Sequence, residues 1–374
     1  MKYIFFLSRD YLDLAKEEVL SLFNIKEYKI IDGLLVIGLM ENSDENLIKK
    51  LALTKGIYRL LFECKVNQLI KIMEKYDWDS IYNDNFCLRI YNFDDNKNNH
   101  NNEKSIIKSI NEKPNKKINK NKNYSEKNLA GYIWRSLKHP KVNLENPKTK
   151  VELFFIKHKV YGGLLIKENN EDFESRKAHL RPFPHPSSLH PKLARALVNV
   201  AGIEDGTLLD PFCGTGGFLI EAGLMGIKII GCDISKNMAK GCKENLNHFK
   251  IKNYRIINQN ALNIKKKADC VITDLPYGLN SNVYLQYNKR SLKKFDNKIN
   301  LKIKTNKKDA IKNLERFYLR FLTKLRKILK NKAVIIFPSY VDYRKLLKAA
   351  KFRIDKEFSI YVHRSLTRKI VKIG

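Results

Sequence analysis

The second half of this 374-residue chain predicts an α/β fold with a mainly parallel sheet. Short apolar runs alternate with amphipathic segments from residue 187 onward, which is the pattern of strands and helices in turn. A glycine-rich turn, Gly214-Thr215-Gly216-Gly217, follows the first of these runs. Acidic residues close three of the runs, at Asp210, Asp233 and Asp274. We therefore expect a sheet with helices on both faces and a ligand site at the carboxyl ends of its strands.

The elements of this half can be placed from periodicity and capping residues. A helix is expected after Ser187 or Ser188 as N-cap. A long helix near the end carries Phe317 and Phe321 on its apolar stripe, so both rings are expected in the core. The closing pair of strands, joined by a short turn, fits an antiparallel hairpin at the sheet edge. The expected strands are 207–209, 227–232, 254–257, 271–273, 333–337, 358–362 and 368–373, and the expected helices are 217–225, 235–249, 309–329 and 343–351.

The first half of the chain is predicted to contain both helices and strands, and it has no catalytic motif. Residues 1–50 predict a small α+β unit, and residues 51–167 predict a second region with strands at 57–64, 86–91, 151–156 and 160–166. Residues 92–128 are rich in Asn and Lys and nearly free of large apolar side chains, so we expect a flexible insertion there. Residues 168–186, with three prolines close together, predict a linker to the domain of residues 187–374.

The charge of the chain is strongly positive and unevenly distributed. The formal net charge is +33, from 72 Lys and Arg against 39 Asp and Glu. Residues 1–91 hold 13 basic and 14 acidic side chains, whereas residues 281–374 hold 27 basic and 6 acidic ones. A general compositional bias toward lysine would give every segment of the chain a similar excess of positive charge. The uneven distribution therefore favours a polyanionic partner that binds the C-terminal third.

Several classes of protein are disfavoured by composition. No apolar run has the length of a membrane helix, and the N-terminus lacks the features of a signal peptide. The six cysteines are scattered without a C-x-x-C pair, which disfavours a disulfide framework and a zinc site. We expect a cytoplasmic, monomeric protein without a metal.

The glycine-rich turn has three possible interpretations. A phosphate-binding P-loop needs Lys-Ser/Thr after the last glycine, where this chain has Phe218-Leu219. A dinucleotide fingerprint needs a third glycine at Leu219. An acid at Asp210 suits a cationic amino group better than a pyrophosphate, Asp233 suits ribose hydroxyls, and Asn260 suits an adenine edge. This combination favours S-adenosylmethionine, with candidate cofactor-binding residues Asp210, Phe212, Gly214, Thr215, Gly216, Asp233, Ile234, Asn260 and Ala261.

The loop after the expected strand 271–273 carries the candidate catalytic residues Asp274, Leu275, Pro276 and Tyr277. The Asp274 carboxylate and a neighbouring backbone C=O can both accept hydrogen bonds from an –NH2 group. Pro276 stiffens the turn, and the ring of Tyr277 can stack on a planar group. The loop therefore predicts a site that holds a nucleobase amine for methylation.

These two motifs, residues 210–217 and 274–278, resemble those of the S-adenosylmethionine-dependent amino-methyltransferases. Upstream, residues 51–64, 131–135 and 142–147 are similar to a THUMP RNA-binding domain, and residues 181–183 and 190–196 to its junction with the methyltransferase. The family with this combination is the archaeal tRNA guanosine-10 N2-methyltransferases. The resemblance implies a Rossmann-like methyltransferase domain after an α+β region with a ferredoxin-like start, a tRNA substrate and one or two methyl transfers. Leu275 stands where many amino-methyltransferases have a second proline.

Other functions stay open at this point. One alternative is a relative that methylates another tRNA guanosine, such as position 6, and another is an amino-methyltransferase acting on DNA adenine or protein glutamine. The THUMP-like half argues against DNA and protein. An RNA-binding homologue without activity is the alternative from a different class, and the intact Asp210, Asp233 and Asp274 argue against it.

Overall fold

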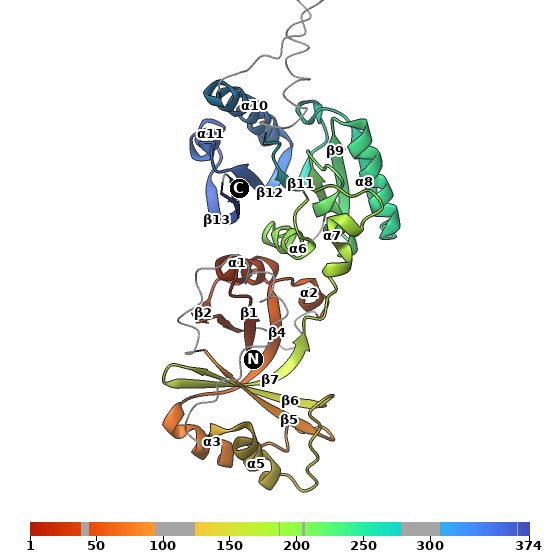
Figure 1. Cartoon of the computed structure of the whole chain (residues 1–374). Helices are drawn as coiled ribbons and strands as arrows, with labels where there is room; N and C mark the ends of the chain where they lie inside the picture. Colours follow the sequence, from red (N-terminus) through yellow and green to blue (C-terminus); the bar gives the residue numbers. More distant parts are fainter. Residues whose placement is uncertain (39–44, 94–123, 187, 204–205, 278–306, 365) are drawn as a thin grey trace, which may run out of the picture. The chain divides into compact units, whose positions relative to one another are not determined.

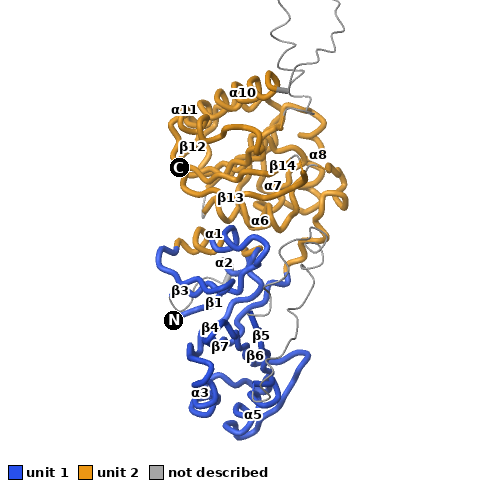
Figure 2. Tube along the Cα trace, turned by 60° about the vertical axis from the view of Figure 1, so that its left-hand side comes forward, with its two compact units in different colours: residues 1–16, 25–49, 53–170 blue, residues 17–24, 50–52, 171–374 orange. Residues whose placement is uncertain are grey.

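The computed structural model describes residues 1–374 apart from 39–44, 94–123, 187, 204–205, 278–306 and 365. The chain divides into two compact units, which are coloured separately in Figure 2. Unit 1 comprises residues 1–16, 25–49 and 53–170, and unit 2 comprises residues 17–24, 50–52 and 171–374. In the described residues, each unit is built on a seven-stranded sheet.

The sheet of unit 1 has the strand order β2-β3-β1-β4-β7-β6-β5 (Figure 1). Its neighbouring strands are antiparallel except β5 and β6, which run parallel. The 12-residue strand β4 pairs with β1 on one side and β7 on the other. Residues 1–50 and 51–167 therefore contribute to one continuous sheet. The elements between residues 1 and 170, of which the second half of α1 and the last residue of α2 belong to unit 2, are β1 (Lys2–Leu7), α1 (Leu12–Leu22), β2 (Tyr28–Ile31), β3 (Leu34–Gly38), α2 (Glu45–Lys50), β4 (Thr54–Lys65), η1 (Val66–Gln68), α3 (Leu69–Lys75), β5 (Phe86–Asn92), α5 (Glu126–Ser136), β6 (Thr149–Ile156) and β7 (Lys159–Glu168).

Two apolar clusters hold unit 1 together. One packs α3 and α5 on the sheet, with Met73, Ile133 and Leu153 buried between them. The other is rich in aromatic rings and contains Phe6 and Phe154, whose centroids lie 5.7 Å apart. Burial of rings of this size contributes a large share of the stability of a small sheet domain.

The expected insertion at residues 92–128 falls mostly outside the described residues, which exclude 94–123. Its last residues are helical, because α5 begins at Glu126. The Ser125 side chain accepts a hydrogen bond from the Asn128 amide and caps this helix. The helix α5 thus begins inside the range 92–128 that the sequence assigned to a flexible insertion.

Unit 2 has the strand order β10-β9-β8-β11-β12-β14-β13. The first five strands run parallel, and β14 and β13 form an antiparallel hairpin beside β12. The predicted α/β fold with a closing hairpin is therefore confirmed. Its elements are η5 (Glu174–Arg176), η6 (Ala178–Leu180), α6 (Pro191–Val200), β8 (Thr207–Asp210), α7 (Gly217–Leu224), β9 (Lys228–Asp233), α8 (Lys236–His248), β10 (Tyr254–Asn258), η7 (Ala261–Asn263), β11 (Ala268–Asp274), α10 (Lys307–Ile328), β12 (Leu329–Pro338), α11 (Tyr343–Ala349), β13 (Ile354–His363) and β14 (Leu366–Ile373).

The long helix α10 buries its apolar stripe against the sheet, as its three-and-four spacing predicts. Phe317 and Phe321 are both buried in this core, which confirms their assignment. Both rings also meet Phe212 edge-on, with centroids 5.9 Å and 4.9 Å from it. The core under α10 therefore supports the loop that follows β8.

The start of α6 differs from the prediction. Its N-cap is His190, whose Nδ1 accepts a hydrogen bond of 3.2 Å from the Lys192 amide. Pro191 takes the first helical position, where its missing N–H costs nothing. Neither predicted serine caps the helix: Ser187 lies outside the described residues, and the Ser188 hydroxyl lies 3.3 Å from that of Thr215 instead.

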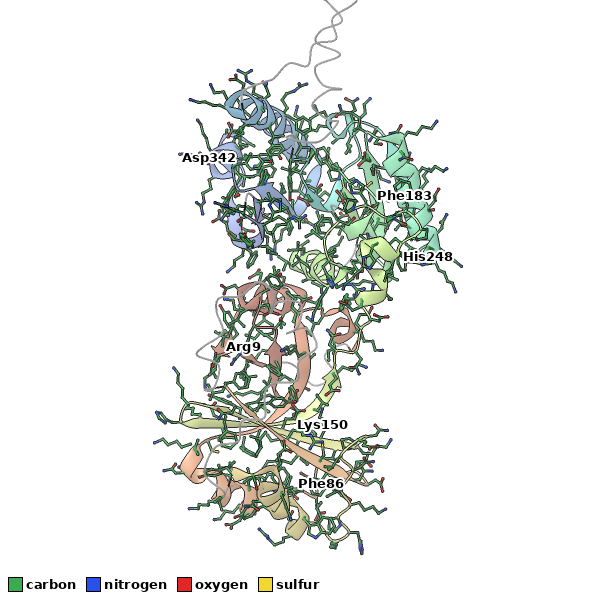
Figure 3. The ribbon with its side chains drawn as sticks, viewed as in Figure 1. Arg9, Phe86, Lys150, Phe183, His248 and Asp342 are labelled. Carbon is green, nitrogen blue, oxygen red and sulfur yellow. The ribbon has the colours of Figure 1, made fainter. Side chains whose placement is uncertain are left out.

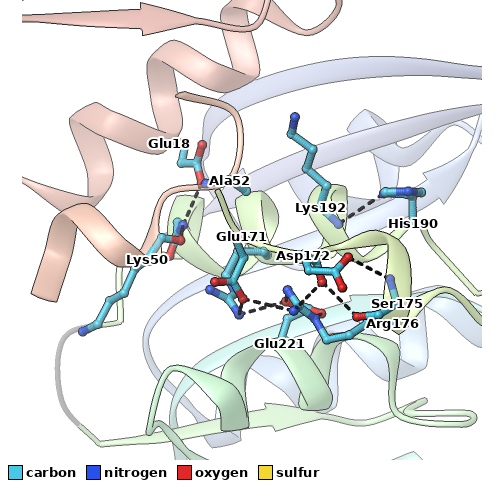
Figure 4. Close-up of polar contacts among 12 residues, drawn as sticks. Glu18, Lys50, Ala52, Glu171, Asp172, Ser175, Arg176, His190, Lys192 and Glu221 are labelled. Carbon is cyan, nitrogen blue, oxygen red and sulfur yellow. Dashed lines mark hydrogen bonds and ion pairs between the residues drawn. The ribbon is translucent and has the colours of Figure 1, made fainter. Parts of the chain in front are cut away.

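A buried ion-pair network fastens the segment before α6 to α7 (Figure 4). Glu221 is fully buried, with Oε1 2.9 Å from Nε of Arg176 and Oε2 3.0 Å from Nη2 of Arg195. Phe183, labelled in Figure 3, packs against Gly241 of α8, and its amide and carbonyl groups both bind the side chain of Asn245. These contacts place residues 171–186 with unit 2.

Among the helices that the structure describes, none combines the length and apolar character that crossing a bilayer requires.

Candidate active site

Three acidic residues stand at the ends of three adjacent strands in unit 2. Asp210 ends β8, Asp233 ends β9 and Asp274 ends β11, and these strands are neighbours in the order β9-β8-β11. Parallel strands present their carboxyl ends at one edge of a sheet, so the sequence pattern brings the three carboxylates to the same edge.

The glycine-rich turn after β8 depends on glycine at two positions. Gly214 and Gly216 have φ values of +50° and +88°, in the left-handed region that side chains disfavour. A Cβ atom at Gly216 would lie 2.8 Å from Sγ of Cys242, whereas one at Gly214 would meet open space. Gly216 is also the N-cap of α7. The backbone near Gly214 is therefore open to a ligand, and that near Gly216 is packed against α8.

Asp210 is buried and held in place from two directions. Its Oδ1 accepts hydrogen bonds from the Thr273 hydroxyl at 2.8 Å and from the Phe212 amide at 3.1 Å. Burial, together with the charges of Asp233 and Asp274, raises the pKa of Asp210 to about 7. A carboxylate in this environment favours a cationic group beside it.

Asp233 shapes the adjoining part of the site. Its Oδ2 accepts from the Gly214 amide at 3.0 Å, and its Oδ1 accepts from the Ser235 amide at 2.8 Å. Burial raises the pKa of Asp233. The next residue, Ile234, is 39% exposed, so an apolar surface lies open beside this carboxylate.

The polar residues at the end of β10 and just after it have different roles. The side-chain oxygen of Asn260 accepts from the Leu262 amide at 2.9 Å and caps η7, and Ala261 behind it is buried. The side chain of Asn258 instead donates to the carbonyl groups of Asp233 and Ile234, at 2.9 Å each. The sequence analysis missed Asn258, although its place at the end of a parallel strand was a usable signal.

The loop after β11 is fixed by hydrogen bonds with α10, with β12 and with a tyrosine that follows β12. The Tyr318 hydroxyl donates to the Pro276 carbonyl at 2.9 Å, and the Tyr340 hydroxyl donates to the Tyr277 carbonyl at 2.6 Å. The amide of the buried Leu275 donates to the Ile336 carbonyl at 3.2 Å. These bonds supply the rigidity that a second proline at position 275 would otherwise provide.

The side chains of this loop are engaged with each other. The Tyr277 hydroxyl donates to Oδ1 of Asp274 at 2.7 Å, and Nε of Arg368 donates to the same hydroxyl at 3.0 Å. Oδ2 of Asp274 lies 3.6 Å from Nε of Arg368. Burial raises the pKa of Asp274 to about 6 and also raises the pKa of Tyr277. Arg368 comes from β14 and was not among the sequence-predicted site residues.

Within the described residues, no group of three or more His, Cys, Asp or Glu side chains is placed to hold a metal ion. All six cysteines lie in the described part of the chain, and each is buried with a free thiol.

Comparison with known proteins identifies the family. Residues 178–289 match the family model described as RMKL-like, methyltransferase domain. The tRNA (guanine(10)-N2)-dimethyltransferase of Methanothermobacter thermautotrophicus is 29% identical, over 99% of this chain and 98% of that protein. The "Probable tRNA (guanine(10)-N2)-dimethyltransferase" of Methanothermococcus thermolithotrophicus is 32% identical over 48% of this chain and 95% of that protein. The chain belongs to the tRNA (guanine(10)-N2)-dimethyltransferase family.

A solved structure of another protein shares the fold of this family member. The crystal structure of TrmN from Thermus thermophilus aligns with a TM-score of 0.50 at 15% sequence identity, covering 100% of this chain and 99% of that one. At this identity the likeness concerns the fold alone, and it agrees with a Rossmann-like methyltransferase domain in unit 2.

Proposed function

We propose that this chain transfers methyl groups from S-adenosylmethionine to the N2 amine of guanosine 10 in tRNA, giving N2-methylguanosine and N2,N2-dimethylguanosine. Family membership supports the substrate, because the relatives above carry this activity in their names. The observation that carries the chemistry is the loop after β11, where the Asp274 carboxylate and the Leu275 carbonyl follow each other at the edge beside Asp210.

The residues at the carboxyl edge fit the cofactor. Asp210, buried and with a raised pKa, suits the cationic amino group of its methionine part. Asp233 suits the ribose hydroxyls, with the exposed Ile234 beside it for the apolar adenine face, and Asn260 and Ala261 border the same region. The turn that contains Phe212, Gly214, Thr215 and Gly216 borders the same region, and its backbone at Gly214 leaves room for the cofactor. The cofactor would supply a methyl group on a sulfonium, whose departure as a neutral thioether needs no metal.

The protein's task is to orient a weak nucleophile. The N2 lone pair of guanine is delocalised into the ring, so the amine attacks poorly when it is planar. Hydrogen bonds from N2–H to Asp274 and to the Leu275 carbonyl favour a pyramidal nitrogen and point its lone pair at the methyl group. Within the part of the chain that the structure describes, no hydrogen-bond donor reaches the Leu275 carbonyl oxygen, so it can accept one from the base.

The balance of the step is simple. A bond forms between N2 and the methyl carbon, the carbon–sulfur bond breaks with its electron pair going to sulfur, and N2 releases one proton. The guanine must leave its stem to reach the loop, and Tyr277 is the ring on which it stacks after leaving.

The N-terminal half is the second part of the proposal. We assign residues 51–167, with the insertion at 92–128, as a THUMP domain that binds tRNA, preceded by the unit of residues 1–50. Residues 168–186 form the linker to the methyltransferase domain of residues 187–374. A cytoplasmic, monomeric enzyme without a metal remains our prediction.

One experiment tests the activity and its position together. Unmodified tRNA transcript is incubated with the protein and labelled S-adenosylmethionine, then digested for nucleoside mass spectrometry and mapped. We expect N2-methyl- and N2,N2-dimethylguanosine at position 10. The product at another guanosine would redirect the proposal to a different tRNA site, and tRNA protection without incorporation would indicate a binding protein instead.

A matched variant tests the role of the loop. Asp274→Asn keeps the shape of the side chain but removes its charge, and we expect the single-turnover rate to fall by about 10²- to 10³-fold. Cofactor affinity should stay unchanged, because Asp274 is placed on the base side of the site. Retained methyl transfer would remove Asp274 from the mechanism.

A further inference from the structure

Arg368 reaches the candidate active site from a strand that the sequence pattern did not connect with it. In the sheet, Asp274 on β11 lies opposite Ile336 on β12, and Pro338 on β12 lies opposite Arg368 on β14. Because β14 is antiparallel to β12, its first residues stand at the edge where the parallel strands end. The closing hairpin therefore places the Arg368 guanidinium at the edge of the sheet where the parallel strands end, beside Asp274.

The contacts of Arg368 involve both polar groups of the loop. Its Nε donates to the Tyr277 hydroxyl at 3.0 Å and lies 3.6 Å from Oδ2 of Asp274. A guanidinium donates and does not accept. The Tyr277 hydroxyl therefore directs its own proton to Asp274, where the 2.7 Å bond to Oδ1 is found. The side chains of Arg368 and Asp274 are 13% and 24% exposed, so water screens this pair only partly.

We propose that Arg368 is a positioning residue for methyl transfer, which keeps the Asp274 carboxylate ionised and oriented as the acceptor of the base amine. This inference rests on the proposed function. A protonated Asp274 would present a hydroxyl to N2–H and lose one acceptor, so the charge of this carboxyl group decides whether the amine is held correctly.

The surroundings of Asp274 make this charge hard to maintain. Among the residues that the structure describes, the other titratable groups that act on it or feel its charge are Asp210 of β8, Tyr277 of the loop and Tyr318 of α10. None of these three carries a positive charge. Burial raises the pKa of Asp274 to about 6, and the charge of Arg368 is the largest effect that opposes it, ahead of the Tyr277 hydrogen bond. Loss of Arg368 should raise the pKa of Asp274 further, so that a larger fraction of this carboxyl group is protonated near neutral pH.

The test is the pH profile of single-turnover methyl transfer on tRNA, with the protein in excess over tRNA and the cofactor at saturation. Arg368→Gln and Arg368→Met both remove the charge, and the glutamine can still donate to Tyr277. We expect the acid limb of both variants to move upward by about one pH unit or more, since a cation within about 4–6 Å lowers a carboxyl pKa by about 1–3 units. Activity should recover as the pH rises toward 9. Arg368→Lys keeps the charge and should keep the acid limb near that of the unchanged protein.

Lys369→Met is the matched control, because Lys369 is the next residue of β14 and its Nζ binds the Ser359 hydroxyl instead. It should leave the pH profile unchanged. An acid limb that does not move in the Gln and Met variants would overturn the inference, as would a loss of rate that is equal at every pH. A raised KM for tRNA with no shift of the acid limb would make Arg368 a phosphate contact instead.

Cofactor titration of each variant separates misfolding from a catalytic effect. If Arg368→Met does not bind cofactor, the acid limb of the pH profile of Arg368→Gln shows whether Arg368 controls the ionisation of Asp274. Failure of the proposed function looks different, because the unchanged protein would then yield no methylated guanosine at any pH.

Discussion

The Tyr277 hydroxyl donates a hydrogen bond of 2.7 Å to Oδ1 of Asp274. One of the two carboxylate oxygens thus already has a hydrogen-bond donor before a base amine arrives. In the proposed function, Tyr277 provides both this donor and the ring on which the base stacks, and the two roles can be separated by substitution.

Tyr277→Phe keeps the ring but removes a hydrogen bond that lowers the pKa of Asp274. At pH 8.5, where Asp274 stays ionised, we therefore expect methyl transfer to persist with kcat/KM near that of the unchanged protein. Tyr277→Ala removes the ring as well. Stacking of a base on an aromatic side chain contributes about 1–3 kcal/mol, so kcat/KM should fall by about 5- to 150-fold. Steady-state kinetics on tRNA give both values, and Tyr254→Phe, distant in sequence and bonded to Asn247, is a control for loss of a tyrosine hydroxyl. Equal losses in the Phe and Ala variants would contradict the stacking role.

The sequence sufficed for the parts of the site that depend on strand order. Asp210, Asp233 and Asp274 each end an apolar run, and parallel strands necessarily bring such residues to one edge. The left-handed conformations of Gly214 and Gly216 are likewise what a sharp turn into a helix requires. The long helix and the closing hairpin followed from periodicity and a short turn.

Other parts of the fold and of the site depend on contacts between residues far apart in the sequence, which no local sequence pattern indicates. Arg368 follows Tyr277 by 91 residues, and only the antiparallel register of β14 makes them neighbours. The strand β2 has only four residues, and its apolar side chains are mostly exposed, so neither a long apolar run nor burial on one face marks it. His190 caps α6 through a ring nitrogen, and histidine is not among the usual N-cap residues. The continuous sheet of unit 1 also depends on the pairing of β4 with both β1 and β7, which its sequence does not specify.

Glu221→Gln should destabilise the protein, because it removes the fully buried carboxylate between the guanidinium groups of Arg176 and Arg195. The carboxylate that then remains beside them is Glu171, which is 37% exposed. Breaking a buried ion pair from one side costs about 3–5 kcal/mol. For a unit of this size, each kcal/mol lowers Tm by about 2–4 °C, so we expect a fall of about 6–20 °C. Differential scanning calorimetry measures it. Glu244→Gln is the control, since its ion pair with Lys240 is exposed and 3.7 Å long, and its Tm should change little. Similar Tm values for the two variants would show that the buried network is not stabilising.

Cofactor binding should weaken as the pH falls through 7. Asp210, with a pKa raised to about 7, must be ionised to pair with a cationic amino group. Below that pH its proton has to leave first, so affinity should fall by up to about tenfold for each pH unit. Isothermal titration of S-adenosylmethionine between pH 6 and 8.5, in two buffers of different ionisation enthalpy, measures both the affinity and the released proton. Asp210→Asn should bind weakly at every pH and release no proton. A pH-independent affinity in the unchanged protein would argue against the contact.

Binding of tRNA should depend on a basic stripe along α10, defined by Lys308, Lys312, Arg316, Arg320 and Lys324 at intervals of four residues. The same helix binds the catalytic loop through the Tyr318 hydroxyl, so phosphates held along it would lie in the same unit as the site. The double variant Lys312→Gln, Arg316→Gln should bind tRNA more weakly. If each side chain neutralises one phosphate, the slope of log K against log salt should fall by about 1.4–1.8. The double variant Lys240→Gln, Lys243→Gln on α8 removes the same charge from another helix, and a salt titration by filter binding compares the two. An equal effect of both pairs would assign the binding to net charge alone and not to this stripe.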